Sequence, residues 1–481
     1  MNDKLIKKLK KDTNNSSYII YRDKYIKGNK ITIIYHEALT SSDKLSDFVI
    51  RSLDYIETIY DKKDLLYDTI INNITNIKIK KIKNYKDLCN YLNNGFAIIL
   101  IEDDYSIALE TRGSLFRSID KPLTENTIRG SIDSFNENLE TNIGLVKRRI
   151  KSNNLWNDDL FIGRYTKTKI SILTINGITK NNVKDIIIKR LSNVNIDKLI
   201  DSGTLKFLIE DELKTIFPTI MTTERPDKVC DALLNGKTVL LIDNSPFALI
   251  MPTILNDFFI SEEDKDSKSI NNTLTRILRY VAFFITIMTP GLYIAVITFN
   301  QEMLPLELLV SFSSQRSTVP FPAFFEALLM VLAFEILRES DLRIPNSSNS
   351  SLSIVGALIL GEAAVSAGIV SPVMIIVEAI TAISALLITE PELINAIRWY
   401  RLFFMIGATT LGMFGVFIVF ILFTVNLCSI NTFGVPYTLG YAPLSLSTLK
   451  NSILKFPLKK RTKRDKFLTN NITREVIHEK N

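Results

Sequence analysis

The chain of 481 residues is poor in the side chains that form most catalytic and metal sites. Its three cysteines, Cys89, Cys230 and Cys428, are too few and too scattered for a disulfide-stabilised secreted fold. Its two histidines, His36 and His478, lie near opposite ends, which excludes a histidine-based metal site or triad as a prediction. The GxGxxG and GxSxG patterns are also missing from the sequence. We therefore predict no enzyme, no cofactor and no metal site.

The charge of the chain is unevenly distributed. It carries 58 Lys and Arg against 51 Asp and Glu, a formal net charge of +7. Residues 450–481 contain ten basic and three acidic side chains, so residues 1–449 are neutral overall. Because this basic stretch follows apolar sequence directly, we predict a cytoplasmic tail that binds anionic membrane lipid, and no nucleic acid partner.

The first 260 residues have the pattern of a soluble α/β domain. Short β-branched runs such as Ile31–Tyr35 and Phe96–Ile101 alternate with amphipathic helical stretches such as Asp43–Tyr60. We predict two small α/β lobes, residues 1–95 and 96–260, with the break somewhere within 90–130 and no internal repeat. The charged start, Met1–Lys8, has no apolar core behind it and so does not resemble a signal peptide, which predicts a cytosolic domain.

Residues 261–275 are polar and are expected to connect this domain to a helical membrane domain, residues 276–449. A helix needs roughly 20 apolar residues to cross about 30 Å of hydrocarbon. Four apolar stretches of 18 residues or more predict about five to six membrane segments. The stretches are Tyr280–Phe299, Pro320–Leu337, Ser351–Thr389, which Ser371-Pro372 divides, and the charge-free Leu402–Leu449.

Basic residues beside these stretches predict their orientation. Arg276 and Arg279 place the start of the first span inside, and Arg398 and Arg401 place the start of the last stretch inside. Five full spans would then leave the basic tail outside, which contradicts its charge. We expect the charge-free stretch to resolve this conflict with a broken or re-entrant return over Leu439–Leu449.

Carboxylates inside these apolar stretches are the most informative polar residues, because a charge in lipid costs several kcal/mol unless protein or water covers it. Glu362 lies among small residues, which suit either an ion path or tight helix packing. Glu326 and Glu335 are expected to pair with Arg338 or to reach the interface. The candidate residues for an ion path or for helix packing are Glu362, Ala363, Ala364, Val365, Ser366 and Glu378.

Four groups of residues, spread over roughly 110–430, form a specific combination. They are Arg117-Ser118-Ile119 with Arg129-Gly130; Gly163-Arg164-Tyr165-Thr166-Lys167; Glu224-Arg225-Pro226-Asp227-Lys228 with Asp243-Asn244-Ser245-Pro246; and Pro290-Gly291, Pro320–Phe324, Ser353–Leu358 and Ser371-Pro372. In this order and spacing they resemble the A subunit of spore-germination nutrient receptors, the GerA family of endospore-forming bacteria. Some positions depart from the family pattern: Asn244 stands where Gly is usual, Glu362 where Gln is common, and Ser366 where Glu is common.

The resemblance implies a multi-pass subunit of the inner spore membrane with a cytoplasmic N-terminal domain. It implies a transporter-like B subunit that binds the nutrient and a lipoprotein C subunit as partners. It further implies a ring of A subunits around a nutrient-gated cation path; the alternative is a non-conducting scaffold or signalling subunit of the same receptor. Structural roles are implied for the motif residues Arg129, Gly130, Arg164, Lys167, Arg225, Pro226, Asp243 and Pro246.

Overall fold

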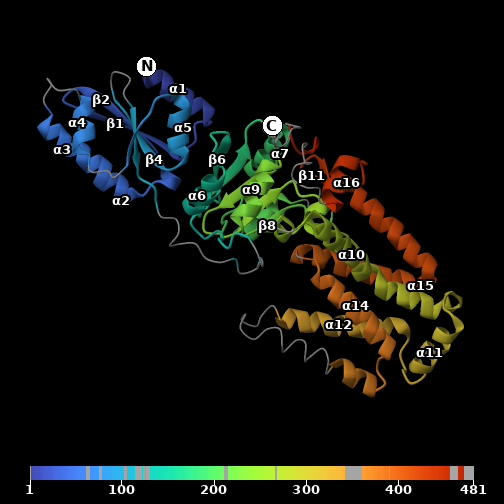
Figure 1. Cartoon of the computed structure of the whole chain (residues 1–481). Helices are drawn as coiled ribbons and strands as arrows, with labels where there is room; N and C mark the ends of the chain where they lie inside the picture. The colour runs from blue at the N-terminus through green and yellow to red at the C-terminus, as the bar shows by residue number, and fades with distance from the viewer. Residues whose placement is uncertain are drawn as a thin grey trace.

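The structure is a computed structural model of the whole chain, in which two α/β lobes precede a helical region (Figure 1). It describes residues 2–60, 66–74, 78–101, 106–113, 122, 125, 130–210, 215–265, 268–341, 360–388, 390–454 and 464–470. We call residues 2–113 the first lobe, residues 130–260 the second lobe, and residues 268–454 the helical region.

The first lobe is an antiparallel five-stranded sheet covered by helices on both faces (Figure 1). The strand order is β1-β2-β4-β5-β3. The strands are β1 (Ile19–Ile26), β2 (Asn29–His36), β3 (Ile79–Lys81), β4 (Phe96–Leu100) and β5 (Ser106–Glu110). One face packs on α1 (Asn2–Asp12) and α5 (Tyr85–Asn93), and the other on a continuous helical stretch, α2 (Ser42–Leu45), η2 (Ser46–Ile50) and α3 (Arg51–Ile59), and on α4 (Leu66–Asn73).

The boundary between the lobes lies later than residue 95. The fully apolar β4 and its neighbour β5 are strands of the first sheet, hydrogen-bonded to β2 and β3. The expected division into 1–95 and 96–260 is therefore wrong, although the chain does leave the first sheet within the expected interval of 90–130. Composition alone could not show which of two sheets a buried strand joins.

The second lobe repeats the topology of the first. Its antiparallel sheet has the order β6-β7-β9-β10-β8, so the strands occur in the same sequence and positions as in the first lobe. They are β6 (Leu155–Ile162), β7 (Thr168–Ile175), β8 (Met221–Thr223), β9 (Thr238–Ile242) and β10 (Ala248–Met251). The helices α6 (Leu139–Arg149) and α9 (Pro226–Leu234) cover one face, and α7 (Asn181–Ser192) and α8 (Ser202–Ile209) cover the other. The expectation of no internal repeat is thus wrong at the level of topology.

The helical region extends away from the second lobe (Figure 1). Its helices are α10 (Ser269–Thr298), η7 (Gln301–Met303), α11 (Leu306–Arg316), α12 (Ala323–Asp341), α14 (Pro372–Leu386), α15 (Pro391–Ser429) and α16 (Leu446–Ile453), and residues 360–366 are also helical. Within the described residues, α10 and α15 are long and apolar enough to cross a membrane, and α14 is a shorter apolar helix. The proline that opens α14 and the Ser371 hydroxyl that caps it give a physical reason for the division at Ser371-Pro372.

Helix α15 is a hairpin of two helices, 391–411 and 413–429, rather than one rod. Gly412 between them has the non-helical angles φ 61° and ψ −139°. The hydroxyl of Tyr400 donates to Asn426 Oδ1 at 3.0 Å, although 26 residues of straight helix would separate them by about 39 Å. A Cβ on Gly415 would lie 1.9 Å from the Gly407 carbonyl oxygen, so the two halves touch through glycine backbone.

The hairpin corrects the expected return of the chain. The charge-free stretch turns back at Gly412, and residues 413–429 run back as a helix; the return does not lie over Leu439–Leu449. That later segment carries turns after the short ribbon of β11 (Asn431–Thr432) and β12 (Val435–Pro436), and its end opens α16. The glycine-rich composition of residues 407–415 is the signal for this turn.

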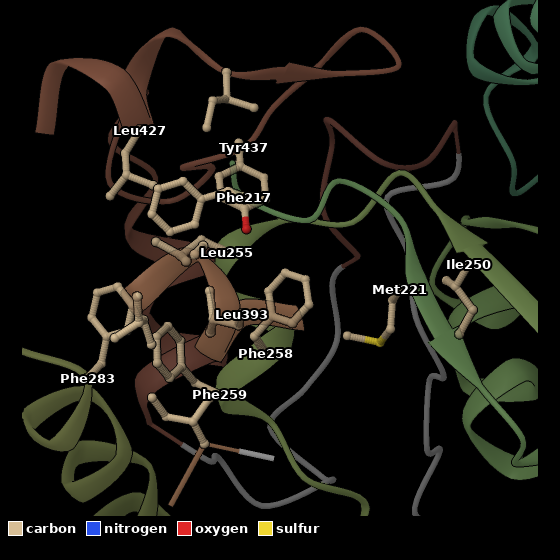
Figure 2. Close-up of a cluster of buried hydrophobic side chains, with 14 of the residues drawn as sticks. Phe217, Met221, Ile250, Leu255, Phe258, Phe259, Phe283, Leu393, Leu427 and Tyr437 are labelled. Carbon is tan, nitrogen blue, oxygen red and sulfur yellow. The ribbon is translucent and has the colours of Figure 1, made fainter. Parts of the chain in front are cut away.

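The second lobe and the helical region share one apolar core. Phe217 of the lobe lies 5.3 Å from Tyr400 and 6.1 Å from Phe423 between ring centroids, both on α15. Figure 2 shows part of this shared core, with Phe217 and Tyr437 above Leu255 and with Phe283 of α10 at the side. The lobe is therefore built onto the helices and is not merely tethered to them.

The described residues of the expected connector, 261–265 and 268–275, form a folded junction. Asp264 is buried and accepts from Arg276 Nε at 2.8 Å and from Arg279 Nη1 at 3.0 Å. Helix α10 already begins at Ser269, so the helix continues from the lobe surface into the apolar stretch. The two arginines that were expected to orient the first span thus fix the lobe to α10.

A segment of the C-terminal tail packs against the second lobe. Asn470 donates from its backbone to Ile178 O at 2.9 Å and from its side chain to Thr179 O at 3.1 Å. Arg464 Nε donates to Leu234 O at 2.9 Å. The N-terminal lobes and residues 464–470 consequently lie on the same side of the helical region, whereas the basic run 459–461 falls outside the described residues.

Candidate functional site

The carboxylates of the helical region separate into an enclosed group and an exposed one. Glu326 of α12 belongs to the enclosed group and is fully buried. It accepts a hydrogen bond from the backbone N–H of Ser371 at 2.6 Å and another from the Ser371 hydroxyl, and Arg316 Nε lies 3.6 Å away. Glu326 therefore ties α12 to the start of α14, and Arg338 is not the partner found for it.

Glu335 and Glu378 are enclosed by arginines of α15. Glu335 pairs with Arg398 and with Arg401, each at 2.9 Å. Glu378 lies 3.6 Å from Arg401 Nη1, and its buried oxygens make no hydrogen bond among the described residues. Arg398 and Arg401, which were expected to orient the membrane segments, therefore also neutralise carboxylates between helices.

Glu362 differs from these three because its side chain is exposed on the helical segment 360–366. Ala363 and Ser366 are exposed beside it, whereas Ala364 and Val365 are half-buried and Ala364 packs against the helix core. The structure thus brings Glu362, Ala363 and Ser366 together on an outward surface and separates them from Glu378. We call Glu362, Ala363 and Ser366 the small-residue face.

A second site lies where the chain passes between the lobes, and Arg225 is its centre. Arg225 is almost completely buried, and its guanidinium donates to Glu125 O at 3.2 Å and to Ser131 O at 3.1 Å. Asp227 Oδ2 accepts from the same guanidinium at 2.7 Å. Because Pro226 opens α9, the motif positions Arg225 just before the helix, where it holds the connecting chain at two points.

Lys228, one turn into α9, extends this site to the helical region. Its amine lies 3.0 Å from Glu125 and 2.7 Å from Glu390, the residue that precedes α15. Burial opposes the charged amine, but the Glu390 and Glu125 carboxylates outweigh it and hold the pKa of Lys228 above its ordinary value. Burial raises the pKa of Glu125, which Lys228 and Thr223 partly offset. One buried cation therefore connects the interlobe chain, α9 and α15.

The remaining motif residues lie in turns, away from Arg225. Arg164 and Lys167 are exposed in the turn between β6 and β7, with Lys167 at φ 45°. Asp243 and Pro246 belong to the turn between β9 and β10, where Asn244 has φ 64°. A left-handed position suits Gly or Asn, so the departure from Gly at this position keeps the turn.

The first motif contributes two further residues, Arg129 and Gly130. Gly130 has φ 124°, a backbone angle that requires glycine, and Arg129 falls outside the described residues.

Sequence reasoning missed the acidic residues that precede the charge-free stretch. Glu390 pairs with Lys228, and Glu392 pairs with Lys206, both from the second lobe. Their position in the sequence could have indicated this role. Carboxylates at the start of a long apolar helix lie where the helix meets the neighbouring domain.

These features define a class of protein: a duplicated α/β domain joined through buried ion pairs to a helical region with membrane-length apolar helices. The model for "Bacillus/Clostridium GerA spore germination protein" matches residues 7–467. The chain therefore belongs to the GerA family, as the motifs predicted.

Individual relatives agree with this assignment. The chain is 38% identical over 458 residues to Spore germination protein KA of Bacillus subtilis (strain 168), covering 94% of this chain and 84% of that protein. It is 35% identical to Spore germination protein B1 of the same strain, covering 91% of each. It is 30% identical to Spore germination protein GerLA of Bacillus cereus, covering 89% of this chain and 87% of that protein.

A solved structure is also similar over the lobes. The crystal structure of the N-terminal domain of the A subunit of the Bacillus megaterium spore germinant receptor GerK3 is 29% identical. The match covers 52% of this chain and 94% of that structure, with a TM-score of 0.41.

Proposed function

We propose that this chain is the A subunit of a spore germinant receptor in the inner spore membrane. Its family membership supports a role in spore germination, and the named A subunit among similar structures supports this particular subunit type. No motif for catalysis supports an enzymatic alternative. Its partners in this proposal are a transporter-like B subunit that binds the nutrient and a lipoprotein C subunit.

The proposed topology has an even number of crossings, with both lobes and the tail in the cytoplasm. The docking of residues 464–470 on the second lobe supports this, because the chain must return to the side from which it left. Five spans would leave the tail on the opposite side of the membrane from the lobes. The second half of α15, after Gly412, adds a sixth segment that returns the chain to the first side. Six membrane segments are then α10, α12, the helix through residues 360–366, α14 and the two halves of α15.

We further propose that several copies surround a cation path lined by the small-residue face. The observation that supports this is the contrast between Glu362, which is exposed, and the other three carboxylates: Glu326 and Glu378 are buried, and Glu335 is half-buried and paired with arginines. An ionisable side chain at membrane depth requires cover by protein or water, and a single copy provides none for Glu362. A ring of copies would supply both, with water along the axis.

The alternative is a non-conducting scaffold in which the small-residue face packs against another helix. Small residues allow close helix contact, which favours this alternative as well. The two functions differ in what a bulky side chain on that face would do: it would change ion flux in a path and would disrupt assembly in a scaffold.

The test is potassium release from spores whose germinant receptor contains this chain with Ala363→Trp. Potassium release at matched receptor abundance is expected to change, because the indole would narrow the path. Ala364→Trp is the matched control, since Ala364 packs against the helix core and its enlargement should lower receptor abundance instead. Unchanged release with Ala363→Trp at equal abundance would remove this face from the path, and lost assembly would favour the scaffold.

A further inference from the structure

The outer face of α8 carries large apolar side chains that are exposed. Phe207 is 61% exposed, and Leu208 and Ile200 are exposed as well. Thr204, Phe207 and Leu208 follow the helical spacing i, i+3, i+4 and therefore share one side of α8, and Ile200 lies just before the helix begins at Ser202. Lys206 and Leu205 point the other way and are buried. An exposed apolar face of this kind marks contact with a protein or a membrane.

The position of α8 relative to α15 indicates which of the two covers it. The amine of Lys206 pairs with Glu392, in the first turn of α15. Phe207 follows Lys206 directly, so it lies at the level where α15 leaves the second lobe. The first half of α15, residues 391–411, is about 31 Å long, so it extends from this level through the headgroup layer into the hydrocarbon.

The segment after α8 comes closer still to the apolar helices. Phe217 stacks on Tyr400 of α15 at 5.3 Å, within the core that also contains Phe283 of α10 (Figure 2). Phe283 lies only one turn inside the charge-free run that begins at Tyr280. The neighbouring Ile216 is 46% exposed, so an apolar side chain of the lobe points outward at the same depth.

Trp399 lies about 10 Å of helix beyond Glu392 on α15, at the level of Tyr400. It is 55% exposed and adjoins Tyr400, the residue that Phe217 contacts. Tryptophan is enriched at the boundary between headgroups and hydrocarbon, where its ring is apolar and its N–H remains hydrated. The exposed residues of α8, Ile216 and Trp399 thus form one apolar border around the site where α15 leaves the lobe.

We propose that the second lobe rests in the interfacial layer of the bilayer, with Phe207, Leu208 and Ile216 inserted at the boundary between headgroups and acyl chains. The occupant of this surface is lipid, whose apolar boundary is continuous with the surface that surrounds α15. The inference rests on the proposed membrane placement of the helices. In this arrangement movements of α8 are coupled to the lipid surface as well as, through Lys206 and Glu392, to α15.

The test is depth-dependent fluorescence quenching of the full chain in phosphatidylcholine vesicles whose acyl chains are brominated close to the headgroup. One protein keeps Trp399, which serves as the reference for a position in the membrane. In the reporter proteins both natural tryptophans, Trp156 and Trp399, are replaced by Phe, so that only the introduced tryptophan gives a signal. A reporter with Phe207→Trp should be quenched to an extent similar to Trp399. The matched control is Phe161→Trp. Phe161 is similarly exposed, at 67%, but it lies on β6, which pairs with β7 at the edge of the sheet.

The outcomes separate this inference from the membrane placement on which it rests. Quenching with Phe207→Trp and Trp399 but not with Phe161→Trp supports the inserted lobe. Quenching of Trp399 alone leaves the helices in the membrane and overturns the inference, with water or a protein partner on α8. Absence of quenching for all three overturns the membrane placement itself. If Phe207→Trp impairs folding, Ile216→Trp gives the same readout on the neighbouring segment.

Discussion

The two lobes have the same topology but are attached to the rest of the molecule in different ways. In the first lobe, two apolar cores lie on opposite faces of the sheet and are confined almost entirely to that lobe. In the second lobe, the core under α6 and α9 continues without interruption into the helical region. The comparison teaches that one copy of the repeated fold shares its core with the helical region, whereas the other keeps two cores of its own.

The contacts between the lobes include several hydrogen bonds between polar groups, beside the packing of Tyr18 and Ala38 on the second lobe. Asn14 donates to Asp158 at 2.9 Å, Ser16 to Asn157 at 2.6 Å, and Trp156 Nε1 to Asp12 O at 3.1 Å. Interfaces between domains of one chain that are small and polar allow relative movement by default. The first lobe is therefore the part of the chain best placed to move when a partner binds.

The largest expected effect comes from breaking the shared core with Phe217→Ala. Removing a buried phenyl ring that contacts Tyr400 and Phe423 should lower the free energy of unfolding by about 3–5 kcal/mol. Calorimetry of the full chain in detergent should show this loss in the transition shared by the second lobe and the helices. The transition of the first lobe should not move.

Phe161→Ala is the matched control for this experiment, because it removes an exposed ring from the same lobe. It should change stability by no more than about 0.5 kcal/mol. Equal losses in all transitions with Phe217→Ala would contradict the separation of the two lobes.

The duplication shows how far the sequence could predict this fold. Strands such as Phe96–Leu100 and Thr238–Ile242 were predictable from their apolar runs, yet their equivalence was not recognised. The signal was present: Gly95 and Gly236 both follow a helix, both have positive φ, and each directly precedes or closely precedes the buried strand. Only the pairing of strands, which depends on contacts distant in sequence, identifies the two units as copies.

The candidate sites were predictable to different degrees. The motif with Arg225 could be recognised from the sequence. Its hydrogen bond to Glu125 O could not, because it joins residues 100 positions apart and no periodicity of the sequence predicts such a contact. Glu378 and Glu335 were identifiable as carboxylates within apolar stretches, whereas their arginine partners depend on how α12, α14 and α15 pack. Glycines that let helices turn, such as Gly412, resemble glycines that let helices pack, so the hairpin also required the structure.

The next largest effect concerns Lys147, which is buried in α6 beside the first lobe. Burial lowers the pKa of Lys147 from 10.5 to about 8, so keeping its amine charged near neutral pH destabilises the folded chain. Lys147→Met should therefore raise the free energy of unfolding by about 3 kcal/mol below pH 8. The gain should shrink as the pH rises from 8 towards 10.5, because the folded protein then releases the proton and the cost disappears.

Denaturant titration of the full chain at pH 7 and pH 10 measures this dependence. Lys151→Met, which replaces an exposed lysine two residues beyond α6, should leave stability within about 0.5 kcal/mol at both values. A loss of stability with Lys147→Met would mean that the amine makes a favourable interaction at the boundary between the lobes.

The smallest expected effect is a pH dependence that belongs to the first lobe. His36 at the end of β2 is fully buried against Tyr18, with both ring nitrogens lacking a hydrogen-bond partner among the described residues. Burial, and secondarily the charge of Lys147, lowers the pKa of His36 well below its ordinary value. The unfolded chain therefore takes up a proton below pH 6.5 that the folded lobe cannot bind, and stability must fall as the pH decreases.

The variant that isolates this effect is His36→Phe, which keeps a ring beside Tyr18 and removes the titration. Between pH 7.5 and pH 5.5 the unsubstituted chain should lose about 1.4 kcal/mol more stability than the variant. The fluorescence of Trp156, measured with Trp399→Phe in both proteins, reports the transition because its indole N–H bonds the first lobe at Asp12. Protonation of His36 on opening would then destabilise the first lobe, while the apolar core that Phe217 shares with α15 keeps the second lobe on the helices. Equal pH slopes in the two proteins would assign the loss to other groups.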